Sequence, residues 1–142
     1  MKIQNTRFGE VEYQADEILH FPQGLIGFEQ LHDFVVMPNK QKGPLFWIQS
    51  IDDPAIAFIL TDPTNFFLDY KVEPEQAECE VLQADDVGDI YVLSIVTVST
   101  NREITLNLAA PILFNPKTRR AMQVILEGTS FSPQTPLPTE QK

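Results

Sequence analysis

The sequence predicts an all-β fold, namely a single small antiparallel β-barrel-like domain with one or two short helices at most. Three observations support this prediction. Short β-rich runs are cut by Pro, Gly, Asp and Asn along most of the chain. Eleven prolines are spread over the sequence, and each one ends or breaks a helix. The length of 142 residues and the apolar content of 43% suit one domain with a sizeable core.

Short strands are expected in order along the first half of the chain. Phe8–Val11 is a tight connection between two strands, the second of which carries Val11 and Tyr13. Alternation is clearest further on, where Ile56, Phe58 and Leu60 share one face. The strands that follow the first two are expected at residues 18–21, 34–37, 45–50, 56–61 and 66–72.

The strongest single element is the run of residues 90–99, which has apolar side chains on both faces. This pattern predicts a central strand that is covered on both sides. Thr100 and Asn101 then form a short turn into residues 102–108, where apolar and polar residues alternate. Together the two runs predict a β-hairpin.

Two further segments have less regular patterns. The segment after Asn115 is able to begin a helix that runs to Gly128, with Pro116 in its first turn. Three basic residues would then lie at the positive end of the helix dipole, so we favour a second hairpin. Residues 75–82 are expected to form a short acidic helix, whose inward side chains are Ala77, Val81 and Leu82.

The two ends of the sequence differ from its middle. From residue 128 the chain is rich in Ser, Thr, Gln and Pro, so we expect a β-barrel domain at 1–127 and a flexible C-terminal tail at 128–142. The first seven residues lack the apolar core of a signal peptide, and no run approaches the ~20 apolar residues that span a bilayer. These features predict a cytoplasmic protein that does not act at a membrane.

The negative charge is concentrated in one segment. The formal net charge is −10, and eleven of the twenty acids lie between Asp52 and Asp89 with Lys71 as the only base. Such a segment attracts a basic partner and repels phosphate, so direct nucleic-acid binding is not expected. The alternative interpretation is a solvated acidic face that only aids solubility.

Carboxylates are the only abundant reactive side chains. Asp52, Asp53 and Asp62 are able to supply an acid-base pair or oxygen ligands for a divalent cation. The Asp-Pro pairs favour turns instead, in which the Asp oxygen accepts hydrogen bonds from local amides. Residues 85–89 resemble a calcium loop but lack its final glutamate. We therefore expect no catalytic residue, no metal site and no cofactor.

Histidine and cysteine do not change this expectation. His20 and His32 lack the spacing that places two imidazoles on one metal ion. Cys79 is the only cysteine, so no intrachain disulfide forms, and its acidic neighbours suppress the reactive thiolate.

Residues 21–29, Phe-Pro-Gln-Gly-Leu-Ile-Gly-Phe-Glu, form neither a regular strand nor a polar loop. One interpretation is a core plug that tucks Phe21, Leu25 and Phe28 under the barrel. The other interpretation is an exposed recognition loop, because apolar loop residues at a surface indicate a partner site.

An ordered set of motifs resembles the flagellar assembly factor FliW family. The set spans about residues 1–126, and its order is more specific than any one motif. The motifs are Arg7-Phe8-Gly9-Glu10, the segment 21–29, Gln49-Ser50, Asp52-Asp53-Pro54, Ala57-Phe58, Asp62-Pro63, Asp69-Tyr70, Asn107-Leu108, Ala110-Pro111, Asn115 and Gln123-Val124-Ile125-Leu126.

The resemblance implies a small, cytoplasmic, non-enzymatic β-barrel-like protein of flagellated bacteria, which we expect to be a monomer. Proteins of this family bind flagellin. They also bind CsrA, a small dimeric RNA-binding protein that represses flagellin translation. Flagellin that accumulates in the cell occupies FliW, and its export frees FliW to bind CsrA and lift the repression.

Charge and loop chemistry suggest which residues contact each partner. The candidate contacts for CsrA are Asp52, Asp53, Asp62, Asp69, Glu73, Asp85, Asp86 and Asp89. The candidate contacts for flagellin are Phe21, Leu25, Ile26 and Phe28. The competing functions are a carboxylate-dependent hydrolase or metal enzyme that uses Asp52 and Asp53, and a secreted adhesin-like β-domain.

Overall fold

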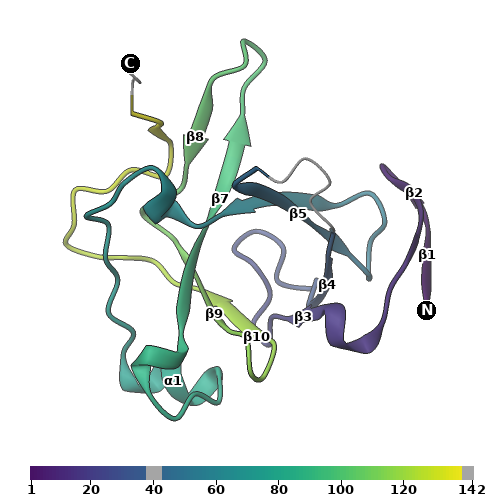
Figure 1. Ribbon diagram of the computed structural model, residues 1–142, viewed down its shortest axis with the longest axis horizontal. Coiled ribbons are helices and arrows are strands. Elements are labelled where there is room, and N and C mark those ends of the chain that lie inside the picture. Colours follow the sequence, from purple (N-terminus) through teal and green to yellow (C-terminus); the bar gives the residue numbers. More distant parts are fainter. Residues whose placement is uncertain (38–42, 139–142) are drawn as a thin grey trace.

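The computed structural model describes residues 1–37 and 43–138 (Figure 1). One short α-helix, α1 (Gln76–Val81), and the 3-10 turns η1 (Ala15–Glu17), η2 (Pro63–Asn65) and η3 (Val87–Asp89) occur in these ranges. None of the described helices is long and apolar enough to cross a membrane. The strands are β1 (Lys2–Thr6), β2 (Gly9–Glu12), β3 (Ile18–His20), β4 (Asp33–Val36), β5 (Leu45–Ser50), β6 (Ala57–Thr61), β7 (Tyr91–Val98), β8 (Ile104–Leu106), β9 (Ile112–Asn115), β10 (Arg120–Gln123) and β11 (Thr135–Pro136).

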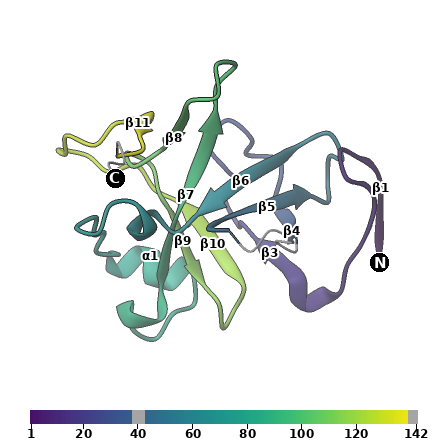
Figure 2. The same ribbon diagram turned by 45° about the horizontal axis from the view of Figure 1, so that its top comes forward.

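Seven of the described strands close into a barrel. Their order is β7-β6-β5-β4-β3-β10-β9, and β9 returns to β7 because β7 pairs with both β6 and β9. These pairs are antiparallel except β3–β10, which is parallel and joins His20 to Arg120. Strand β8 extends the sheet beyond the barrel, and β1–β2 form a separate hairpin at its side (Figures 1 and 2). The predicted all-β, barrel-like fold is confirmed.

Apolar side chains fill the interior of this barrel, as is usual for a small barrel. The rings of Phe21 and Phe34 meet edge to face, with 5.4 Å between their centroids. The cluster of buried side chains inside the barrel stabilises it, and this cluster includes Phe21 and Leu25, two of the candidate flagellin contacts. Its buried members are Leu19, Phe21, Leu25, Phe34, Ile48, Leu60, Ile112 and Ala121.

Both predicted hairpins are confirmed. Strand β7 lies centrally, between β6 on one side and β8 and β9 on the other, and it pairs with β8 from Val96–Leu106 to Val98–Ile104. After Asn115 the chain turns back into β10 and does not form a helix. The buried Asn115 amide donates to the carbonyl of Leu82 at 3.0 Å and accepts from the Lys117 amide at 3.0 Å, which stabilises the turn.

Four of the later predicted strands are confirmed as β3 to β6, but the strand predicted at residues 66–72 is wrong. This segment forms turns, in which the Tyr70 amide donates to the carbonyl of Phe67 at 2.9 Å. Phe66, Phe67, Tyr70 and Val72 all pack into one cluster with Val96, Leu106 and Leu108. A strand would send alternate side chains to opposite faces, so only a turning backbone brings all four to the same core.

The predicted acidic helix is confirmed as α1, with one orientation corrected. The backbone amide of Glu75 donates to the Glu78 carboxylate at 2.8 Å, as in a capping box. Leu82 is fully buried and Val81 partly buried, as expected, but Ala77 is exposed. The helix packs against the barrel through its C-terminal end, beside Leu113 and Met122, and Ala77 lies one turn before that contact and stays exposed.

The described part of the C-terminal segment lies against the body. Thr135 and Pro136 form β11, which pairs antiparallel with β8 (Figure 2). The ring of Phe131 meets the ring of Tyr70 at 4.9 Å between centroids. Sequence patterns did not indicate these contacts. The division at residue 128 stays a prediction, and residues 139–142 of that tail lie outside the described residues.

Candidate functional site

Three of the candidate acids accept hydrogen bonds from backbone amides. The Asp52 carboxylate accepts from the backbone amides of His32 at 3.1 Å and Asp33 at 3.4 Å. Asp53 accepts from the Ala55 amide at 3.0 Å, and Asp62 caps η2 by accepting from the Thr64 amide at 2.9 Å. The turn interpretation is confirmed for Asp53 and Asp62, which bond to amides two residues away, whereas Asp52 joins its loop to the start of β4. Carboxylates used in this way hold the loops in shape.

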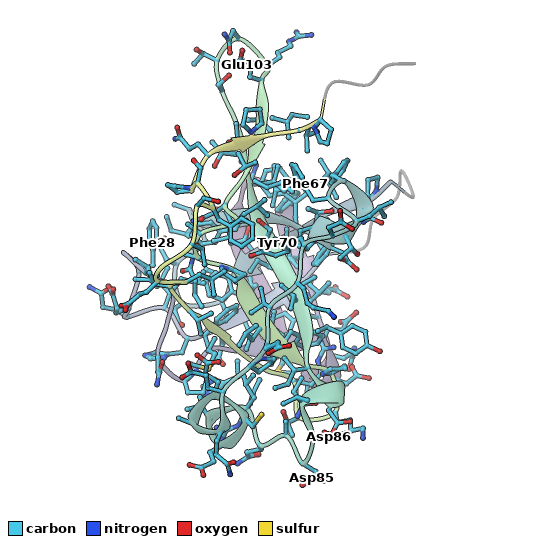
Figure 3. The ribbon with its side chains drawn as sticks, turned by 90° about the vertical axis from the view of Figure 1, so that its left-hand side faces the viewer. Phe28, Phe67, Tyr70, Asp85, Asp86 and Glu103 are labelled. Atoms are coloured by element: carbon cyan, nitrogen blue, oxygen red, sulfur yellow. The ribbon has the colours of Figure 1, made fainter. Side chains whose placement is uncertain are left out.

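The remaining candidate acids lie on different parts of the surface. Asp85 and Asp86 are exposed at one end of the molecule, and Glu103 at the tip of the β7–β8 hairpin marks the opposite end (Figure 3). Asp69 is also exposed. Asp89 is the exception, because its carboxylate is 20% exposed and pairs with the Lys117 ammonium at 3.1 Å. Asp89 is therefore already neutralised within the chain, whereas Asp85 and Asp86 are available to a partner.

An acidic groove of about 420 Å³ lies between the loop before α1 and the chain after β10. Glu73, Glu75, Glu78 and Glu127 line it, and its apolar floor is formed by Val72, Val124, Ile125 and Leu126 with Thr129 beside them. Ile125 is 65% exposed. No lysine or arginine is among these lining residues. We call this surface the acidic groove.

The sequence identified only part of this groove. Glu73 belongs to the acid-rich segment that charge counting found, but Glu127 and the floor residues 124–126 come from far along the chain. They reach Glu73 because Val124 and Leu126 donate backbone hydrogen bonds to Pro111 and Ala109, which holds this stretch beside the barrel. A charge count along the sequence contains no signal for this juxtaposition.

The loop of residues 21–29 is a core plug. Phe21 is 0% exposed and Leu25 is 1% exposed, and Phe28 is partly buried with its ring 5.2 Å from that of Phe58. The expectation that Phe21 and Leu25 offer an apolar contact surface is therefore corrected. The reason is that the loop folds back on itself through a bridge between Leu25 and Phe28, which turns its apolar side chains toward the barrel.

Gly24 makes that reversal of the chain possible. Its φ of +71° lies in the left-handed region, and a Cβ at this position would lie 2.6 Å from the Glu29 backbone. Ile26 is pushed to the outside and is 48% exposed, while its amide donates to the Gln123 side chain at 3.0 Å. Of the four candidate flagellin contacts, Ile26 is thus the one with a largely exposed side chain.

The histidines are held by structural contacts. His20 Nδ1 lies 2.6 Å from the Asp33 carboxylate, and His32 Nδ1 lies 2.9 Å from the carbonyl of Phe21. Their rings stack with 6.3 Å between centroids. Within residues 1–37 and 43–138, no group of three His, Cys, Asp or Glu side chains is arranged to hold a metal ion.

Among the titratable residues of the described chain, Tyr70 has a clearly shifted pKa. Burial raises the pKa of its hydroxyl to about 12, from an ordinary value of 10.0. The hydroxyl donates to the carbonyl of Leu108 at 2.7 Å, which fixes the residue as a neutral donor. Tyr70 therefore joins the loop after β6 to the chain that follows β8 and has a structural role.

Comparison with known proteins finds similarity along the whole chain. A sequence model of a family described as FliW protein matches residues 2–137. A flagellar assembly factor FliW from Syntrophotalea carbinolica is 55% identical over 133 residues, which cover 94% of this chain and 95% of that protein. Flagellar assembly factor FliW 2 from Desulfotalea psychrophila is 51% identical over 142 residues, which cover 100% of this chain and 94% of that protein.

A solved structure has the same fold. It is a crystal structure of the flagellar assembly factor FliW, which is 31% identical to this chain, covers 100% of both chains and superposes with a TM-score of 0.87. The similarity therefore includes the barrel, the 21–29 plug and the segment that carries the acidic groove.

Proposed function

Because the chain belongs to the FliW family of flagellar assembly factors, we propose that it binds flagellin and, when flagellin is absent, binds the translational regulator CsrA in the cytoplasm. The match over residues 2–137 is the single observation that carries this proposal. A flagellar assembly factor acts by binding other proteins. Its expected effect is relief of CsrA repression of flagellin mRNA, without direct contact between this chain and RNA.

The distribution of charge supports a basic partner. The acidic groove combines four glutamates with an apolar floor, and Asp85 and Asp86 extend the negative surface beyond α1. A protein that binds RNA carries exposed cations, which such a surface attracts. Acids docked beside an RNA site also repel phosphate, so one contact accounts for both binding and loss of RNA affinity.

The proposed flagellin contact consists of a few apolar side chains that are only partly exposed. Ile26 projects from the 21–29 plug with 48% of its surface exposed, and Phe28 is partly accessible beside it. The terminal segments of flagellin are amphipathic and unpaired before export, so their apolar face is suited to such a site. We therefore assign Ile26 and Phe28 to this contact and assign Phe21 and Leu25 to its support.

The test is affinity capture with the full chain in a lysate of a motile bacterium, followed by reconstitution from purified components. We expect co-purification of flagellin, and of CsrA when flagellin is depleted. In the reconstituted system, the chain should release CsrA from flagellin mRNA, and added flagellin should reverse this release. Capture of neither protein, with a folded chain, would contradict the proposed function.

A further inference from the structure

The outer edge of β8 is covered by the chain's own C-terminal segment. The register places Thr135 opposite Leu106 and Pro136 opposite Thr105. The Leu108 amide donates to the carbonyl of Ser132 at 3.2 Å, and the Leu137 amide donates to the carbonyl of Ile104 at 3.3 Å. We call residues 131–137 the strap. It occupies the position that an added β-strand takes at a free sheet edge.

Two side chains anchor the strap. The Phe131 ring meets the Tyr70 ring edge to face at 4.9 Å between centroids. Leu137 packs against the cluster that contains Tyr70, Val96, Leu106 and Leu108. Between these anchors the strap has no charged residue. The site therefore accepts an extended, uncharged segment with one aromatic and one aliphatic anchor.

The strap is held less firmly than the barrel strands. Its paired strand β11 has only two residues, and one of them, Pro136, has no amide proton to donate. Phe131 remains 38% exposed in spite of its contact with Tyr70. From Glu127 to Phe131 no backbone amide of the described chain donates to another backbone group, and Gly128 has a φ of +73°. The strap is thus joined to the barrel by a short, exposed connection that is able to act as a hinge.

We propose that the outer edge of β8, together with the Tyr70 ring, is a docking site for an extended segment of a partner protein, and that residues 131–137 occupy this site as an intramolecular competitor. The partner segment pairs with the outward backbone groups of Ile104, Leu106 and Leu108. It places an aromatic side chain on Tyr70 and an aliphatic one on the neighbouring cluster. This proposal is independent of the contacts proposed above at the acidic groove and Ile26.

The backbone directions at β8 support such pairing. Glu103 and Asn107 bond toward β7, because the Ser99 amide donates to Glu103 and the Asn107 amide donates to Ile95. Backbone groups alternate along an antiparallel strand, so those of Ile104, Leu106 and Leu108 point the other way, toward the strap. When the strap leaves, the edge groups of Ile104, Leu106 and Leu108 lose their protein partners, and an incoming strand satisfies them again.

The test uses a fluorescent peptide with the sequence of residues 129–138 as the probe. It is titrated into the full-length chain and into a full-length Phe131→Ala/Leu137→Ala variant, in which the competitor has lost both anchors. The apparent affinity for the peptide is reduced in proportion to the fraction of molecules in which the strap leaves the site open. We therefore expect the variant to bind the peptide roughly tenfold more tightly than the wild type. Binding of the peptide to the variant should also slow hydrogen exchange at the amides of Leu106 and Leu108.

Two controls make the result specific. Leu68→Ala removes a side chain that is 86% exposed and outside the strap, so its peptide affinity should equal that of the wild type. A peptide in which both anchors are replaced by serine should not bind. Circular dichroism checks that each variant is folded.

Three results would overturn the proposal. The first is no binding of the peptide to a folded double variant. The second is equal affinity for wild type and double variant, since the strap is then no competitor. The third is hydrogen exchange in the strap as slow as in the barrel core at Ile48, which would make the strap a permanent cover of the β8 edge.

Discussion

The hydroxyl of Tyr70 donates a 2.7 Å hydrogen bond to the backbone carbonyl of Leu108, and this bond joins the loop after β6 to the chain that follows β8. Both residues are buried, at 7% and 3% exposure. The same ring supports Phe131 of the strap. Tyr70 thus connects three segments that are distant in sequence, and its substitution tests how much that connection contributes.

Tyr70→Phe should reduce the free energy of unfolding by about 1–2 kcal/mol, because the buried carbonyl of Leu108 loses its donor. Urea denaturation at pH 7 measures this change. Tyr91→Phe is the matched control, since Tyr91 is 60% exposed, and it should change stability by less than about 0.5 kcal/mol. Equal effects of the two substitutions would contradict the structural role of the Tyr70 hydroxyl.

Alkaline pH should destabilise the wild type through the same residue. The pKa of Tyr70 is raised to about 12 in the folded chain, whereas in the unfolded chain it ionises near 10. The contribution of the neutral hydroxyl is fully present below pH ~10, and it is lost as the pH rises from ~10 toward 12 because the unfolded state releases its proton first. Urea midpoints of wild type and Tyr70→Phe should therefore converge over this range. Curves that stay parallel would show that Tyr70 does not cause the loss.

Gly24→Ala should destabilise the protein by about 2–5 kcal/mol, because it combines left-handed backbone strain with a clash against the Glu29 backbone. Gly27→Ala is the matched control. Gly27 has a φ of +86° but open space around the added carbon, so only the strain of about 1–2 kcal/mol is expected. Thermal unfolding of both variants separates the two effects. A Gly27 variant as unstable as the Gly24 variant would contradict the close approach at Glu29.

Ile26→Asp should leave the protein folded and weaken flagellin binding by roughly tenfold, because it places a charge in the proposed apolar contact. Leu25→Asp should unfold the protein, since Leu25 is 1% exposed and the carboxylate would be buried. Leu68→Asp controls for added charge at an exposed aliphatic residue elsewhere, since Leu68 is 86% exposed. Calorimetric titration with flagellin measures affinity. Unchanged affinity of a folded Ile26→Asp variant would place the flagellin site elsewhere.

Charge reversal should slow CsrA association. Two double variants remove attraction to a basic partner, so we expect the association rate of each to fall by roughly fivefold or more. They are Glu73→Lys/Glu127→Lys in the acidic groove and Asp85→Lys/Asp86→Lys beyond α1. Rates of the wild type should fall as salt rises past ~0.15 M, where the screening length is about 8 Å, and dissociation should change less. Stopped-flow or surface-based kinetics gives both rates.

Glu103→Lys is the control for this reversal, because Glu103 is exposed at the opposite end of the molecule (Figure 3). It should bind CsrA with nearly the wild-type rate. If both double variants keep the wild-type salt dependence and affinity, the acids serve solubility and CsrA contacts another surface.

The sequence by itself determined the β-rich fold class and most of its local elements. The period of two in residues 90–108 predicted a central strand and its hairpin, and β7 and β8 confirm it. The basic residues after Asn115 correctly argued against a helix. The Asp-Pro pairs correctly predicted turns, because Asp53 and Asp62 bond to amides only two residues away. Each of these features depends on neighbours within a few residues, which a sequence pattern contains.

Tertiary structure decided which of those residues are available to a partner. Closure of the barrel through β3–β10 and β7–β9 buried Phe21 and Leu25 and left Ile26 outside. Other contacts between distant segments brought Glu127 beside Glu73 and placed the strap on β8. Packing against Val96, Leu106 and Leu108 turned residues 66–72 so that their aromatic rings reach one core. Burial and charge proximity depend on contacts between segments far apart in the chain, and hydrophobic periodicity along a single segment carries no information about them.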